Sequence, residues 1–198
     1  MLKKDEIKVL KVLFTDLTRN LTIMDLSREL KQKYVQTYRT IFSLKKSNDI
    51  FLETIGNSKI VKLNLTKFNP NYVIAEIERL KEGLINKNLN LIHQKIMGVK
   101  ENFVCILFGS QANNSSLKSD FDLLFVIPNE FNYELFERKV KRELTIYNCD
   151  IHIVTEESLL EMWSNPQKLT VGNELLKKHL VLYNAEHFLK MLKTHYVG

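Results

Sequence analysis

Hydrophobic residues recur at helical spacing in three short segments near the start of the chain, and each segment would bury one face of an amphipathic helix. The segments are 5–14, 21–30 and 34–50. Thr22 is the candidate N-cap of the second, because a threonine hydroxyl can accept a hydrogen bond from an amide of the first turn. Two β-rich runs follow in 50–65 around Gly56-Asn57-Ser58, which is typical of a hairpin. Three helices followed by a hairpin is the order of a winged helix-turn-helix domain, which we expect over residues 1–69.

The third of these segments would be the recognition helix, because its polar positions can face a partner while Ile41 and Leu44 turn inward. The residues expected to contact duplex DNA are Gln36, Arg39, Thr40, Lys45 and Lys46. Residues 1–67 contain 14 Lys and Arg against 7 Asp and Glu, an excess that fits binding to a polyanion. The alternative is that this domain binds a protein partner or dimerises, and that its lysines form an ordinary solvated face.

Pro70 marks the expected end of the first domain. From 71 to 97 the pattern is helical, with a break expected around 83–90. The apolar positions of the first part share one stripe, which consists of Val73, Ile74, Ile77, Leu80, Leu84 and Ile85. We interpret residues 70–87 as a linker helix, and its stripe hints at homodimerisation.

The second half of the chain opens with a continuous apolar run, NFVCILF at 102–108, of the kind found in a strand covered on both faces. The run stops at Gly109-Ser110. Glycine permits close backbone approach and an unusual turn, and a serine that enters a short helix can offer its hydroxyl and its amide to a phosphate.

Two aspartates stand one residue apart where the next apolar run begins. In a strand, residues i and i+2 face the same way, so Asp120 and Asp122 would present two carboxylates on one side while Leu123 packs on the other. Carboxylates this close raise each other's pKa unless a cation lies between them, and hard divalent cations suit oxygen ligands. The alternative is a solvated acidic turn that precedes a strand.

A helix is predicted over 131–147 and another strand over 148–154, with Asp150 at its start. Strand, helix and strand can bring the three carboxylates into one cluster. His152 shares a face with Asp150, and we expect it to be packed or hydrogen-bonded rather than to be a ligand. Trp163 is expected to pack in the core.

Composition places these segments in an ordered protein, since 44% of the 198 residues are hydrophobic, 26% are charged and only three are prolines. The first residues lack the apolar core of a signal peptide and no apolar run approaches a membrane span, so we expect a cytoplasmic protein without a membrane contact. Cys105 and Cys149 lie in apolar segments and are interpreted as small buried hydrophobes. Residues 1–100 carry a net charge of +9 and residues 101–198 carry −3, so the two halves differ in the partners they can attract.

The second half resembles a known family. Gly109-Ser110, nine further residues, Asp120-x-Asp122 and then Asp150, within the pattern LFGSxA…SDxDLLFV, is similar to the nucleotidyltransferase domain of the DNA polymerase β superfamily, specifically its minimal branch. The resemblance covers about residues 88 to 198. It implies an α+β protein in which a mixed sheet flanked by helices follows the winged helix.

The resemblance also implies an activity and a set of roles. Gly109 and Ser110 would grip the triphosphate of an NTP, with ATP as the expected substrate, and Asp120 and Asp122 would bind two Mg²⁺ ions. Asp150 would complete a metal site and help to deprotonate the acceptor hydroxyl. One departure is that Asn113 and Asn114 follow the alanine of the motif, where the family commonly has a glycine.

Transfer of a nucleoside monophosphate from an NTP to a hydroxyl is therefore the expected reaction. The acceptor would be a partner protein, such as a paired toxin, an RNA end or a small molecule. The alternative is a DNA-binding transcriptional regulator whose nucleotidyltransferase domain senses nucleotide or is inactive.

Overall fold

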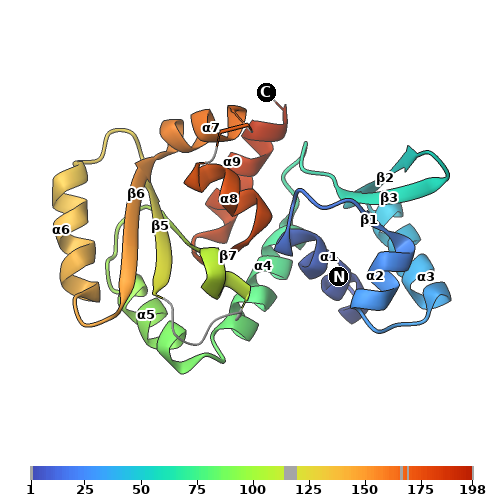
Figure 1. Ribbon diagram of the computed structural model, residues 1–198, viewed down its shortest axis with the longest axis horizontal. Helices are drawn as coiled ribbons and strands as arrows, with labels where there is room; N and C mark the ends of the chain where they lie inside the picture. The colour runs from blue at the N-terminus through green and yellow to red at the C-terminus, as the bar shows by residue number, and fades with distance from the viewer. Residues whose placement is uncertain (1, 114–119, 166, 169, 198) are drawn as a thin grey trace.

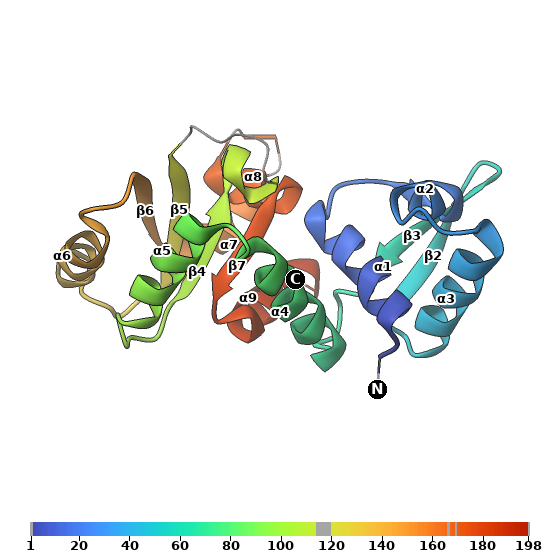
Figure 2. The same cartoon turned by 90° about the horizontal axis from the view of Figure 1, so that it is seen from below.

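The computed structural model describes residues 2–113, 120–165, 167–168 and 170–197. Over these residues the chain is an α+β protein with nine α-helices and two sheets, of three and four strands. Figures 1 and 2 show the two sheets on opposite sides of helix α4 (Pro70–Gly83), which runs between them. None of the helices in the described part is long and apolar enough to cross a membrane.

The first six elements follow the order that the sequence predicts, with one addition. They are α1 (Lys4–Thr15), β1 (Leu21–Thr22), α2 (Ile23–Glu29), α3 (Tyr34–Lys46), β2 (Ile50–Ile55) and β3 (Ser58–Leu63). The addition is the two-residue strand β1, which pairs with β3 and extends the hairpin to the sheet β1-β3-β2. It escaped prediction because two residues are too few to show a periodic pattern.

Local signals in this part of the chain are confirmed at single residues. The Thr22 hydroxyl accepts from the Asp25 amide at 3.1 Å, so it caps α2 as expected. Gly56 adopts φ +59 in the two-residue turn of the hairpin, a conformation that glycine takes without a steric penalty. Ile41 and Leu44 of α3 are fully buried. The second and third helices both end earlier than predicted, and Ile50 already belongs to β2.

The break expected around 83–90 is confirmed, because α4 ends at Gly83 and α5 (Lys87–Met97) begins four residues later. The apolar stripe of the linker helix is divided, because Val73, Leu80 and Leu84 pack against the core clusters and other members are exposed. Ile74 and Ile77 are 40% and 43% exposed, and the buried positions are instead Tyr72, Ala75, Glu76 and Arg79. An ion pair between Glu76 and Arg79 lets these two charged residues be buried beside Tyr72 and Ala75.

The second sheet has the strand order β6-β5-β4-β7, with β5 and β6 parallel and the other pairs antiparallel. Its elements are β4 (Val104–Phe108), the 3-10 helix η1 (Gly109–Asn113), β5 (Phe121–Ile127), α6 (Tyr133–Leu144), β6 (Cys149–Thr155), α7 (Glu156–Ser164), α8 (Val171–Lys177), β7 (His179–Tyr183) and α9 (Ala185–Val197). Helix α6 connects the parallel strands, so the predicted strand-helix-strand unit is confirmed. All five residues of β4 are buried, as expected for a strand covered on both faces.

The two faces of this sheet are covered by different helices. One face, which includes Leu123 and Phe125, packs with α5 and α6, and the other, which includes Ile106 and Leu124, packs with α7 and α9. Trp163 lies in the second layer, 1% exposed, and its Nε1 donates to the Gly172 carbonyl at 2.7 Å, so its expected packing role is confirmed. Cys105 is buried and Cys149 half-buried, both as free thiols.

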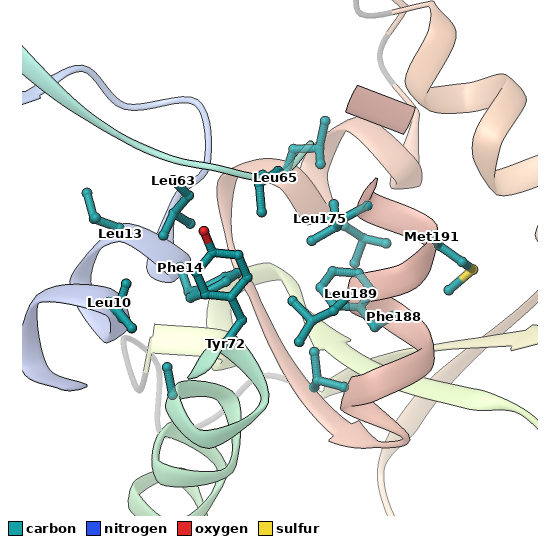
Figure 3. Packing of buried hydrophobic residues seen from close by; sticks show 14 of the residues in the cluster. Leu10, Leu13, Phe14, Leu63, Leu65, Tyr72, Leu175, Phe188, Leu189 and Met191 are labelled. Atoms are coloured by element: carbon teal, nitrogen blue, oxygen red, sulfur yellow. The ribbon is translucent and has the colours of Figure 1, made fainter. Parts of the chain in front are cut away.

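The hydrophobic cluster on that second face continues into the first part of the chain. Figure 3 shows Phe14 of α1 and Tyr72 of α4 facing Leu175 of α8 and Leu189 of α9, and all four belong to one buried cluster. The cluster therefore runs across the boundary expected at residue 70.

Candidate active site

The first residues of β5 and β6 bring two of the predicted carboxylates together. Asp122 and Asp150 are direct partners in the parallel register, and Phe108 pairs with Asp122 on its other side. Because neighbours in register point to the same face, both carboxylates lie on the face that α7 and α9 cover farther along the sheet. Asp120 stands immediately before β5, two residues from Asp122. The sequence-based expectation that these strand starts converge is therefore met for Asp122 and Asp150.

Gly109 lets the backbone pass directly beside Asp122. It adopts φ +69 at the end of β4, and a Cβ built on it would lie 3.1 Å from Asp122 Cγ and closer still to Oδ2. A side chain at this position would therefore displace the carboxylate. Ser110 follows in η1 with an exposed side chain. The close backbone approach predicted for Gly109 is confirmed, and its partner is a carboxylate of the candidate site.

The carboxylate of Asp122 is electrostatically unfavourable when it is ionised. Burial is the largest cause of its raised pKa, and the charge of Asp150 is the next. Asp120 and Glu174 raise the pKa further, whereas His152 lowers it. Four carboxylates thus act on one another at the start of the sheet, and that excess of negative charge favours a cation.

Asp120 and Asp150 are both exposed and each is held by a neighbouring side chain. The Asn148 amide donates to Asp120 Oδ1. His152 Nε2 lies 3.1 Å from Asp150 Oδ2, and the His152 ring packs 5.6 Å from that of Phe108. The expected hydrogen-bonded role of His152 is therefore confirmed.

Asn148 and Glu174 were not identified from the sequence. Asn148 meets Asp120 only through the register of β5 and β6, in which the Phe121 amide donates to the Asn148 carbonyl. Glu174 lies on α8, more than fifty residues after Asp122, and no local pattern connects the two.

The donor set suits a hard divalent cation, although the side chains as they lie do not form a finished metal site. Carboxylate oxygens are the ligands that Mg²⁺ prefers, and the pKa of Asp122 is raised first by burial and then by the charge of Asp150. Across the described ranges, no group of three or more His, Cys, Asp or Glu side chains is arranged to hold a metal ion. Asp120 and Asp150 are instead hydrogen-bonded to Asn148 and His152, respectively. The predicted departure at Asn113 and Asn114 begins a loop whose residues 114–119 are not among the described residues.

The predicted nucleic-acid contacts lie on α3, at the opposite end of the molecule from β5 and β6 in both views (Figures 1 and 2). Arg39, Lys45 and Lys46 are exposed. The other two predicted contacts are engaged within the protein, because the Gln36 amide donates to Asp5 Oδ2 at 2.8 Å and the Thr40 hydroxyl donates to the Gln36 carbonyl at 3.1 Å. The three cationic side chains are therefore exposed, and Gln36 and Thr40 each form a hydrogen bond within the protein.

The support for a nucleotidyltransferase site therefore consists of the motif and its geometry. Comparisons with models of protein families, with curated proteins and with solved structures found no match to this chain.

Proposed function

We propose that this protein transfers a nucleoside monophosphate from an NTP, with ATP as the expected donor, to a hydroxyl acceptor. The observation that supports this most directly is the register pairing of Asp122 with Asp150, beside a Gly109 backbone that only glycine can provide. A phosphate-binding turn and a group of carboxylates then share one edge of a rigid sheet. This arrangement suits phosphoryl chemistry, in which catalysis consists largely of positioning and charge stabilisation.

Each residue has a role in this reaction. The backbone amides of Gly109-Ser110 and the Ser110 hydroxyl would hold the triphosphate, and Asp120, Asp122 and Asp150 would hold two Mg²⁺ ions. When bound, such ions neutralise phosphate charge and make a hydroxyl more acidic. Asp150 would take the proton of the acceptor hydroxyl, whose oxygen bonds to the α-phosphorus as the bond to pyrophosphate breaks. His152 would orient Asp150 through the 3.1 Å hydrogen bond.

Three acceptor classes are compatible with the proposed reaction, namely a partner protein such as a paired toxin, an RNA end and a small molecule. A labelling assay distinguishes them. The protein is incubated with each α-labelled NTP, Mg²⁺ and a cell lysate, and label transfer is followed in the protein, RNA and small-molecule fractions. Transfer should be lost in Asp122→Asn and in Asp120→Asn. Glu134→Gln, a highly exposed carboxylate on α6, serves as the control and should behave like the parent.

Absence of transfer from all four NTPs would contradict the proposal, and so would transfer that persists in both aspartate variants. Recovery of the label in free nucleoside monophosphate alone would point to hydrolysis instead of transfer. The free thiols of Cys105 and Cys149 are the form expected in the reducing cytoplasm, where we place the reaction.

A second candidate function is that of a nucleic-acid-binding regulator in which the nucleotidyltransferase-like part senses nucleotide or is inactive. The order of α1, β1, α2, α3 and the β2–β3 hairpin is that of a winged helix, and exposed cations lie on α3. Salt-dependent binding of duplex DNA that is lost in Arg39→Ala would support this role. Binding that does not change across a salt series would argue against it.

A further inference from the structure

The outer face of α3 carries a row of aromatic side chains that are partly exposed to solvent. Tyr34, Tyr38 and Phe42 follow one another at four-residue spacing, so they lie along one side of the helix. Tyr34 is 44% exposed and Tyr38 is 41% exposed, and Val35 beside them is 59% exposed. The Phe42 and Tyr38 rings stack at 4.4 Å with an angle of 30°, and the Tyr34 ring follows 6.1 Å from Tyr38. We call Tyr34, Tyr38 and Phe42 the aromatic row.

The aromatic row lies in the most uniformly basic part of the chain. Residues 31–47 contain five basic residues and no acidic one. The five are Lys31, Lys33, Arg39, Lys45 and Lys46. None of them forms an ion pair with the described residues, whereas Arg138, Lys141 and Arg142 of α6 each have a carboxylate partner. Lys45 Nζ lies 5.9 Å from the Phe42 ring centroid, so positive charge reaches the row itself.

Unpaired cations around exposed rings favour one class of partner. A protein partner with an acidic surface would satisfy the charge, but flat rings in a row have a specific complement in bases that are free to stack. In duplex DNA the faces of the bases are covered by their neighbours, and only their edges in the groove are available. Gln36 and Thr40, which would read those edges, are engaged by Asp5 and by the helix backbone. The face therefore suits unpaired bases better than a duplex.

We propose that the outer face of α3 binds single-stranded nucleic acid, with bases stacked on Tyr34 and Tyr38 and the phosphates neutralised by Arg39, Lys45 and Lys46. The inference rests on the nucleic-acid-binding role proposed above for the first part of the chain, and it specifies single-stranded rather than duplex nucleic acid as the ligand. It does not depend on nucleotidyl transfer. Phe42 is the third member of the row, and its stacking on Tyr38 holds that ring in place before a base arrives.

Fluorescence anisotropy tests this without NTP or Mg²⁺, with a labelled single strand of about 12 thymidines or uridines and a duplex of the same length. The single strand should bind more tightly than the duplex. Tyr34→Ala and Tyr38→Ala should each weaken single-strand binding roughly fivefold to a hundredfold, since stacking on one aromatic ring contributes that much per base, and the double variant should lose more than either. Tyr38→Phe keeps a ring and should bind like the parent. The matched control is Tyr133→Ala, a tyrosine of α6 that is 47% exposed.

The charged residues have a separate signature. Lys45→Gln combined with Lys46→Gln should lower the dependence of log affinity on log salt by about 1.4, because each phosphate contact on a single strand contributes about 0.7. The tyrosine variants should keep the parent salt dependence. All measurements are repeated in the Asp122→Asn background, in which binding should be unchanged, so that a failure of catalysis is not mistaken for a failure of this surface.

Three results would overturn the inference. The first is tighter binding of the duplex with no effect of the tyrosine variants, which would assign the face to groove recognition. The second is the absence of binding to any strand together with a concentration-dependent dimer that Tyr38→Ala disrupts, which would assign it to self-association. The third is equal weakening by Tyr133→Ala.

Discussion

The backbone of Gly109 lies so close to the Asp122 side chain that a methyl group on the glycine would overlap the carboxylate. The two residues belong to different strands, and the register of β4 and β5 places the end of one beside the start of the other. The backbone conformation at Gly109, the position of the Asp122 carboxylate and the approach to Ser110 are therefore one linked feature.

Gly109→Ala should destabilise the protein more than Gly56→Ala. Both glycines have positive φ, at +69 and +59, so each alanine pays about 1–2 kcal/mol for that conformation. Gly56 has nothing within 4 Å of an added Cβ, whereas the Cβ at Gly109 meets Asp122. Urea unfolding measures the difference in the free energy of unfolding between the two variants. That difference isolates the steric contact of the added Cβ with Asp122. Equal losses in the two variants would show that Asp122 moves aside without cost.

Asp122→Asn should stabilise the protein at neutral pH while it removes activity. Burial and Asp150 raise the pKa of Asp122, so its ionisation costs stability as the pH rises above the unfolded value near 4. We expect the melting temperature at pH 7.5 to rise by about 1–3 °C. Mg²⁺ should raise the melting temperature of the parent and leave that of the variant nearly unchanged. A variant that melts below the parent at pH 7.5 would contradict this account.

Arg79→Leu should be strongly destabilising, because it leaves the Glu76 carboxylate buried without its ion-pair partner. Arg79 Nη1 donates to Glu76 Oε1 at 2.5 Å and Nη2 donates to the His179 carbonyl. Loss of one member of a buried pair costs about 3–5 kcal/mol, against about 0–1 kcal/mol for an exposed pair. Lys81→Leu on the same helix breaks the exposed Glu78–Lys81 pair and is the matched control. Chemical denaturation compares them, and similar losses would refute the prediction.

Stability should fall as the pH drops below about 6.5, in part because of His179. Its Nδ1 donates to the Leu175 carbonyl at 2.7 Å, so the neutral Nε2 faces Arg79, and burial holds the pKa of His179 well below its ordinary value. The unfolded chain then takes up a proton that the folded chain does not, and unfolding is favoured. Urea midpoints at pH 7.5, 6.5 and 5.5 measure the slope. His179→Asn should be less stable than the parent and should show a shallower slope, and an unchanged slope would exclude His179 as its source.

Phe14→Ala should lower the unfolding midpoint reported by Trp163, although Phe14 lies on α1 in the first part of the chain and Trp163 lies on α7 in the second. Both belong to one buried cluster, and the Leu17 amide donates to the Leu176 carbonyl across the same contact. A loss of about 3–5 kcal/mol is expected for a fully buried phenylalanine. Trp163 is the chain's single tryptophan, so its fluorescence reports the part of the chain around the four-stranded sheet. Circular dichroism reports the secondary structure of the whole chain. Met24→Ala, an exposed position, is the control. Separate fluorescence and dichroism transitions in Phe14→Ala would show that the two parts unfold independently.

Local patterns predicted many of the helices and strands before residue 155 and part of the candidate site, but not β1 or the elements from α7 to α9. Hydrophobic periodicity predicted α1 and α6, apolar runs predicted β4 and β6, and the positions of Asp120, Asp122 and Asp150 predicted carboxylates at strand starts. These features depend on short-range rules, namely the side-chain period of a helix or strand and the conformational freedom of glycine. The same rules do not indicate that the charged residues Glu76 and Arg79 of α4 are buried.

Tertiary structure alone decided which groups meet. The register of β5 and β6 placed Asn148 against Asp120, and the packing of α8 brought Glu174 within electrostatic reach of Asp122. Folding also placed Gln36 of α3 within hydrogen-bond distance of Asp5, 31 positions earlier. The sequence by itself determined which residues can ionise, stack or permit a tight turn, because those properties belong to single side chains. Their partners, burial and pKa values depend on contacts between distant segments, which no local pattern contains.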